Sequence, residues 1–260
     1  MKHLLAPALL LLCTYVAGCG ASQNTRALSY GENARRSYEN AFHAYEDHDC
    51  LTALPLFARI RSEYPYSRYA ALAELRIADC NVIQNQYTEA IRAYRSFVRH
   101  RPAHAEVPYA RFKIAEAYFR QIPSDFFLSP PPQERDQTPT RNALRQLRRF
   151  LLDHPDTEYA AEARTMVASA LALLARHELY VANFYLGRDR PLAAVGRLRV
   201  LLDVYEGSGI EPEALLLLGR VYLHMREVSD ARRAFEELIE RFPDSGYAEQ
   251  AREFLRRFEA

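Results

Sequence analysis

The sequence contains no tryptophan and only nine glycines among its 260 residues. Alanine, leucine, arginine and glutamate are abundant instead, and these residues lose little rotamer freedom in a helix. Hydrophobic residues make up 49% of the chain, which is enough to bury a core and excludes a disordered protein. We therefore expect an all-α protein.

The chain also lacks a strong net charge. Its 34 basic and 33 acidic residues give a formal charge of +1, and the two signs are mixed along the sequence. No global field would attract a polyanion such as DNA. We therefore expect no nucleic-acid partner.

The apolar run at the N-terminus, residues 4–16, is too short for a transmembrane helix. It follows a short positive stretch and precedes small residues, as in a secretory signal peptide. The segment "VAGC" resembles the lipobox of bacterial lipoproteins, in which the cysteine becomes the diacylated first mature residue. We expect residues 1–18 to be a lipoprotein signal peptide, Cys19 to be lipidated and residues 19–32 to form a tether. An ordinary secretory signal with an incidental cysteine is the alternative.

Three similar phrases recur along the chain: "YPYSRYA", "HPDTEYA" and "FPDSGYA". In each phrase the proline ends a helix, because the residue before proline is pushed out of α geometry. The hydroxyl residue that follows is expected to cap the next helix, at Ser67, Thr157 and Ser245. The phrase therefore marks the boundary between helical repeats.

A helical stripe runs through each repeat, with an alanine, a large apolar residue four positions later and another three positions after that. The stripe occurs five times: Ala53, Phe57, Ile60; Ala90, Tyr94, Phe97; Ala143, Leu147, Phe150; Ala194, Leu198, Leu201; and Ala231, Phe235, Leu238. Twelve positions before each alanine, with an insertion removed from the third unit, lie Ala41, Ala78, Ala115, Ala182 and Gly219. This pattern resembles the tetratricopeptide repeat, in which small residues let paired helices cross closely. We expect a right-handed superhelix of about five helix pairs.

Two segments depart from a regular repeat. Residues 121–140 read "QIPSDFFLSPPPQERDQTPT", and their prolines predict a loop inserted inside the third unit. Residues 158–186 are apolar at helical period without a breaker, which predicts one or two long helices. We expect N-terminal repeats over 33–120, the insert over 121–140 and C-terminal repeats over 141–260.

A narrower resemblance is carried by one region of the chain. Its residues are Arg135, Asp136 and Pro139, then His177, Glu178, Val181, Ala182 and Tyr185, then Ala194 and Arg197. With the lipobox and the five-unit plan, they resemble the BamD family, tetratricopeptide-repeat lipoproteins of the bacterial outer-membrane β-barrel assembly machinery. The family usually has proline where this chain has Glu206.

The resemblance implies a scaffold that is not an enzyme, needs no cofactor and is lipid-anchored in the outer membrane, facing the periplasm. The implied partners are a BamA-like barrel protein, other assembly lipoproteins and unfolded outer-membrane protein precursors. A pilotin-like periplasmic repeat lipoprotein, assisting secretin or pilus assembly, is the alternative. An accessory subunit of an enzyme is a further one, but the sequence shows no catalytic cluster.

The first helix of each pair has positions that packing does not use, and these are expected to face the concave side of the superhelix. Exposed apolar surface of this kind marks partner sites, and aromatic and arginine side chains make binding hot spots. The expected peptide-binding residues are Arg35, Tyr38, Phe42, Tyr45, Tyr64, Leu72, Leu75, Tyr109, Phe112 and Phe119. A precursor ending in phenylalanine would dock its ring there, with Arg35 near its carboxylate. Burial of the stripe by adjacent helices is the alternative.

The C-terminal half carries arginines near turns, and the family resemblance places the BamA contacts in this half. Arg188 and Arg197 are the expected assembly contacts, since a planar guanidinium pairs well with carboxylates. Solvated surface charge is the alternative for each.

The mature chain retains Cys50 and Cys80. A disulfide between them is conceivable in an oxidising compartment, but two separately buried thiols are the favoured interpretation. The segment "EDHDC" holds groups that can bind metal, yet it lies where a polar turn belongs, so we expect no metal site. The sequence contains no nucleophile motif, phosphate loop or convergent acid pair.

Overall fold

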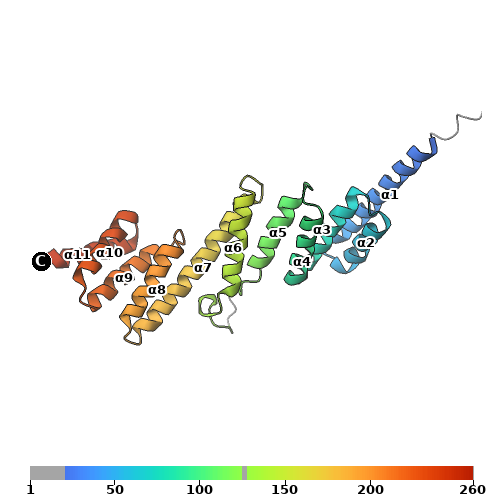
Figure 1. Ribbon diagram of the computed structural model, residues 1–260. Coiled ribbons are helices and arrows are strands. Elements are labelled where there is room, and N and C mark those ends of the chain that lie inside the picture. The colour runs from blue at the N-terminus through green and yellow to red at the C-terminus, as the bar shows by residue number, and fades with distance from the viewer. Residues whose placement is uncertain (1–20, 125–127, 260) are drawn as a thin grey trace, which may run out of the picture. The chain divides into compact units, whose positions relative to one another are not determined.

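The computed structural model describes residues 21–124 and 128–259. These residues form eleven α-helices and one short 3-10 helix, with no strand among them, so the expected all-α fold is confirmed (Figure 1). The expected signal peptide, residues 1–18, and the expected lipidation site, Cys19, lie outside the described residues. The described residues divide into two compact units, and the division falls between His100 and Arg101.

The N-terminal unit contains four helices. They are α1 (Ala21–Glu46), α2 (Cys50–Glu63), α3 (Arg68–Ile83) and α4 (Tyr87–His100). Each helix packs against the next one in the chain, as in stacked helix pairs. Helix α1 includes residues 21–32, so the described part of the expected tether is helical.

The C-terminal unit contains seven helices and the 3-10 helix η1. They are α5 (Val107–Phe119), η1 (Pro132–Glu134), α6 (Thr138–Asp153), α7 (Ala160–Leu186), α8 (Pro191–Val204), α9 (Glu211–His224), α10 (Val228–Arg241) and α11 (Gly246–Glu259). Successive α-helices pack against one another in this unit too. The apolar stretch 158–186 forms a single long helix, α7, of 27 residues.

The repeated stripe forms the core of both units. All fifteen of its side chains are at most 3% exposed, and the alanines twelve positions earlier are equally buried. At the fifth such position a Cβ on Gly219 would lie 2.3 Å from a ring carbon of Phe235. Only a glycine lets α9 and α10 approach this closely around the ring, which is the packing that the sequence pattern predicts.

The helices end where the repeated phrase predicts. Tyr64, His154 and Phe242 precede the prolines with ψ angles of 52°, 60° and 55°, outside the α region. Each donates its backbone N–H to the carbonyl four residues earlier, which satisfies the last turn. Tyr205, before Glu206, has a ψ of 35° and makes the same bond. The helix therefore ends there without proline.

The expected helix caps are confirmed at two of three positions. The Ser67 hydroxyl accepts from the Tyr69 N–H at 3.0 Å, and the Ser245 hydroxyl accepts from the Ala248 N–H at 3.1 Å. The prediction for Thr157 is wrong, because its hydroxyl donates to the His154 carbonyl and its oxygen caps no helix. Helix α7 begins three residues later.

In the described residues of the insert, the chain forms turns and the short helix η1, and α6 begins at Thr138. The Arg135 side chain donates to the carbonyls of Ser124 and Pro130, at 3.2 and 2.6 Å. His177 of α7 donates from Nδ1 to the Gln133 carbonyl at 2.7 Å. The bonds of Arg135 lie within the insert, and the bond of His177 joins η1 to α7, against which η1 packs.

Cys50 and Cys80 form a disulfide, with their Cα atoms 5.5 Å apart. The favoured expectation of two separate thiols is therefore wrong. The packing of α2 on α3 brings the start of one helix to the end of the other, a pairing that the spacing in the sequence does not reveal.

Candidate functional site

The N-terminal unit carries an aromatic cluster, which we define as Tyr38, Phe42, Tyr45, Phe57 and Tyr69. Tyr38 lies at its centre, with its ring centroid 5.4 to 5.8 Å from the rings of Phe42, Phe57 and Tyr69. Phe57 is fully buried, whereas the other four rings are half-buried. The cluster therefore presents several partly exposed aromatic rings packed on a buried one, and aromatic rings are common in binding hot spots.

Three further expected peptide-binding residues lie near this cluster in the sequence but differ in their surroundings. Tyr64 is half-buried and packs edge-on against Tyr30, with centroids 5.3 Å apart. Leu72 is also half-buried. Leu75 is fully buried, so its predicted place on an open surface is wrong. It points into the core of the unit because α3 carries buried side chains on more than one face.

Arg35 is exposed on α1 and is already paired. Its guanidinium contacts Glu32 at 2.8 Å and Glu39 at 3.1 Å. The hydrogen bond to Glu32 raises the pKa of Arg35 above its ordinary value, and the same contact lowers the pKa of Glu32 to about 2. A peptide carboxylate would therefore have to compete with two neighbouring carboxylates.

The remaining expected peptide-binding residues belong to the C-terminal unit. Tyr109 and Phe119 are half-buried, and Tyr109 packs edge-on against Tyr159 with centroids 5.8 Å apart. Phe112 is 2% exposed and stacks on Tyr159 at 5.0 Å, so its predicted place on an open surface is wrong. The ring fills the space between α5 and α6, where it also meets Phe150.

Glu116, on the same helix, is a buried charge with two partners. Its carboxylate contacts Lys113 and Arg120, each at 2.6 Å. Burial raises the pKa of Glu116, but the hydrogen bonds and charges of Lys113 and Arg120 outweigh it and leave the pKa below its ordinary value. This carboxylate is satisfied within its own helix and stabilises α5.

A second aromatic surface lies at the end of α7, and we call it the α7 stripe: Tyr180, Phe184 and Arg188. Tyr180 and Phe184 are spaced by four, so they share one face of the helix, and Arg188 lies in the turn that follows α7. Tyr180 is 39% and Phe184 45% exposed, and the Arg188 guanidinium lies 4.2 Å from the Phe184 ring centroid. The sequence analysis identified Arg188 alone. Large aromatics at positions outside the repeat template were the signal for the other two.

Arg197 of α8 holds a buried carboxylate of α7. Its guanidinium lies 3.2 Å from Glu178, whose side chain is 5% exposed, while the Arg197 side chain is 42% exposed. The hydrogen bond to Glu178 raises the pKa of Arg197. Removing the arginine would leave an unpaired buried charge, so it has a structural role besides any contact with a partner.

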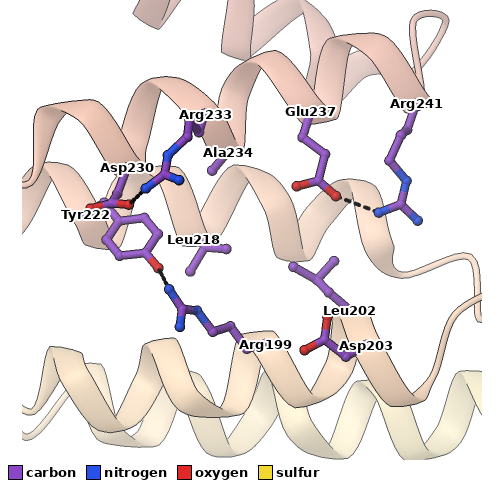
Figure 2. Close-up of a pocket in the computed structure, with 10 residues that line it drawn as sticks. All are labelled: Arg199, Leu202, Asp203, Leu218, Tyr222, Asp230, Arg233, Ala234, Glu237 and Arg241. Atoms are coloured by element: carbon purple, nitrogen blue, oxygen red, sulfur yellow. Dashed lines mark hydrogen bonds and ion pairs between the residues drawn. The ribbon is translucent and has the colours of Figure 1, made fainter.

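A groove of about 440 Å³ lies between α8 and α10, with α9 as its floor (Figure 2). Its lining residues are Arg199, Leu202, Asp203, Leu218, Tyr222, Asp230, Arg233, Ala234, Glu237 and Arg241. Leucine and alanine side chains form the apolar part, and charged side chains line both rims. The sequence did not reveal this groove, because its lining comes from three helices whose pairing becomes visible only in the fold.

Two other kinds of site were sought over residues 21–124 and 128–259. No three His, Cys, Asp or Glu side chains there gather closely enough to hold a metal ion. None of the helices in that part of the chain is both long and apolar enough to cross a membrane.

The helix pairs and their small-residue packing define a tetratricopeptide-repeat protein, and a tetratricopeptide-repeat family model matches residues 216–255. A second family model, YfiO, described as outer membrane lipoprotein, matches residues 31–234. The chain belongs to this outer membrane lipoprotein family.

Similar proteins carry one name. The outer membrane protein assembly factor BamD of Caulobacter vibrioides is 29% identical over 91% of this chain and 75% of its own length. Those of Xylella fastidiosa (strain 9a5c) and Neisseria gonorrhoeae are 27% and 24% identical, over 93% and 96% of this chain and 83% and 94% of theirs. The similarity thus extends over most of each protein.

Proposed function

We propose that this protein is a lipid-anchored scaffold of the outer-membrane β-barrel assembly machinery. In this role it binds a BamA-like barrel protein, other assembly lipoproteins and unfolded barrel precursors on the periplasmic side. The observation that carries the proposal is the family match over residues 31–234, supported by relatives named as assembly factors. A pilotin-like role has no such support.

The aromatic cluster of the N-terminal unit is our candidate for the precursor site. Barrel precursors ending in phenylalanine offer an aromatic ring beside a carboxylate, and Tyr38 and Phe42 offer two stacked rings on the helix that also carries Arg35. Offset and edge-on ring contacts are favourable beyond the burial of area alone. Tyr69, which the sequence analysis did not include, belongs to the same surface through its contact with Tyr38.

The α7 stripe, together with Arg197, is our candidate for the contact with the barrel protein. Exposed Tyr180 and Phe184 supply apolar area, and Arg188 and Arg197 supply guanidinium groups for carboxylates of the partner. Tyr and Arg side chains dominate many protein interfaces in this way.

A peptide-binding experiment tests the precursor site. The mature chain is titrated with a fluorescent peptide ending in phenylalanine with a free carboxylate, and with its C-terminal amide. We expect Tyr38→Ala plus Phe42→Ala to weaken binding of the free acid by about 10-fold or more, because each truncated hot-spot residue typically costs more than 1 kcal/mol. Far-UV circular dichroism and the Tm check that the variant is folded.

The matched control is Tyr180→Ala plus Phe184→Ala, which removes equivalent aromatics from α7. This variant should keep its peptide affinity and lose binding to the periplasmic domains of the barrel protein in a pull-down. Unchanged peptide affinity in a folded Tyr38/Phe42 variant would remove the cluster from the proposal. If both variants bind the peptide and the barrel protein as well as the unsubstituted protein does, the assignment of both surfaces is overturned.

A further inference from the structure

The two rims of the groove between α8 and α10 differ in how their charges are satisfied. On α10, Arg233 pairs with Asp230, and Arg241 contacts Glu237 at 2.6 Å, as Figure 2 shows. Arg241 also lies 3.4 Å from Glu206, so that end of the groove is bridged. The charges of this rim are therefore neutralised within the protein.

The α8 rim keeps unused charge. Arg199 donates to the Tyr222 hydroxyl at 2.8 Å, which is a neutral partner, and Asp203 has no hydrogen-bond or ion-pair partner among the described residues. Arg199 and Asp203 are four positions apart and so lie one helical turn from each other. The rim presents a cation followed, one turn later, by an anion.

An apolar ridge runs beside this rim on the exposed face of α8, and it consists of Leu192, Gly196, Val200 and Val204. Leu192 is 74%, Val200 37% and Val204 55% exposed. The spacing of four places the residues in one row along the helix, and the row is about 18 Å long at 1.5 Å per residue. All three side chains are therefore open to solvent in part, and Leu192 is the most exposed of them.

Gly196 interrupts the ridge at a position where the fold does not require glycine. A Cβ there would meet nothing within 4 Å, and glycine in a helix interior is less favourable than alanine. Gly219 differs, because a neighbouring ring fills the space that its side chain would occupy. The exposed Gly196 lowers the ridge so that another backbone can approach α8 closely.

We propose that the ridge and the adjoining groove bind an amphipathic α-helix of a partner protein. The occupant carries apolar side chains at helical spacing, and beside them an acidic and a basic side chain one turn apart. The acid pairs with Arg199 and the base with Asp203, while an apolar side chain enters the groove over Leu202 and Leu218.

The spacing of the ridge selects a helix over an extended strand. Rows of residues four apart are the ridges that fit into the grooves of a second helix. An extended strand that binds by adding to a sheet edge finds no edge here, because the described residues contain no sheet. About three turns of partner helix would match the length of the row.

The charged rim of this surface is turned away from Arg197, which belongs to the assembly contact proposed above. Arg197 turns toward Glu178 of α7, and Arg199, two residues later, turns toward Tyr222 of α9. Residues two apart lie about 200° apart around a helix, so the two arginines serve different sides of α8. Substitutions of Arg199 and Asp203 can therefore change the groove rim while Arg197 keeps its contact with Glu178.

Site-specific photo-crosslinking of the membrane-anchored full chain tests the proposal. Benzoylphenylalanine replaces Val200 in one protein and Leu152 in the other, and the crosslinked segments are mapped by mass spectrometry. Leu152 is the matched control because it is 78% exposed on α6, away from the groove. We expect position 200 to mark a segment with apolar residues at i, i+4 and i+7 and opposite charges one turn apart.

The mapped segment is then synthesised and titrated against the purified chain. Val200→Glu should weaken binding at least 10-fold, whereas Leu152→Glu should not change it. Arg199→Asp plus Asp203→Arg should weaken binding of the natural peptide. A peptide whose acidic and basic residues are exchanged should bind this variant with most of the original affinity. The Tm of each variant checks the fold.

Four outcomes would overturn the inference: no adduct at 200 beyond that at 152, an adduct with a second copy of this chain, a mapped segment without helical spacing, or unchanged affinity of the Val200→Glu protein. Retained peptide binding at the aromatic cluster in the same variants separates this failure from a failure of the proposed function.

Discussion

The two units of the molecule use one repeat template but stabilise it differently. In the N-terminal unit the cores of the first two repeats are linked by the Cys50–Cys80 disulfide, and buried Asp79 accepts from Tyr94 and pairs with Arg76. The C-terminal unit has no cysteine, and its largest core cluster consists mainly of alanine, leucine and valine. The repeat template therefore determines where helices cross, but the contacts that stabilise each crossing can be covalent, polar or aliphatic.

The units also differ in where they place aromatic side chains. In the N-terminal unit the rings gather between α1, α2 and α3 and support one another, whereas on α7 Tyr180 and Phe184 project outward. Substitutions in such a cluster should change both binding affinity and stability, because the same rings pack in the core. An exposed stripe does not pack in the core, so substitutions there should change affinity with little change in stability.

Removing the disulfide should give the largest effect on this comparison. Cys50→Ala plus Cys80→Ala opens a loop with a sequence separation of 30 residues, for which chain entropy predicts a loss of about 3 to 4 kcal/mol. Hydrogen exchange followed by mass spectrometry should show faster exchange in α1–α4, with that of α8–α10 unchanged. An equal loss of protection from hydrogen exchange in both units would mean that the two units unfold cooperatively.

A pair of glycine substitutions gives the next largest effect, with opposite signs. Gly219→Ala should destabilise the C-terminal unit by about 1 to 3 kcal/mol, because the new methyl group overlaps the Phe235 ring. Gly196→Ala should stabilise it by up to about 1 kcal/mol, because the added methyl group meets no neighbour. Urea titration measures both, and a shared sign would contradict the close approach of α9 and α10.

The smallest expected effect compares two cap positions. Ser67→Ala should cost about 1 kcal/mol, because its hydroxyl accepts from the Tyr69 N–H at the start of α3. Thr157→Ala removes a hydroxyl that caps no helix and should change stability by less than about 0.5 kcal/mol. Thermal unfolding of the two variants under identical conditions checks the difference, and a larger loss at Thr157 would reverse the assignment.

The sequence predicted the helical repeats well because their core depends on local spacing. Small residues and aromatics at fixed intervals, such as Gly219 and Phe235, must face each other once two helices pair. Whether each expected peptide-binding residue is exposed or buried was harder to predict. Leu75 and Phe112 occupy positions that the repeat does not use, but neighbouring helices cover them, and that cover depends on contacts between repeats.

The disulfide and the groove between α8 and α10 could not be predicted for the same reason. Each joins residues from different helices, at distances set by how the helices stack. The exposed apolar row on α8 did leave a trace in the sequence, as residues four apart outside the repeat template. This spacing indicates an exposed apolar row only when the buried face of α8 is known.

Helix α7 joins the insert to the following repeat through consecutive residues. His177 bonds to the Gln133 carbonyl in the insert, and Glu178 holds the guanidinium of Arg197 on α8. His177 and Glu178 are neighbours in one turn of α7, so a substitution that shifts this turn would disturb both contacts at once.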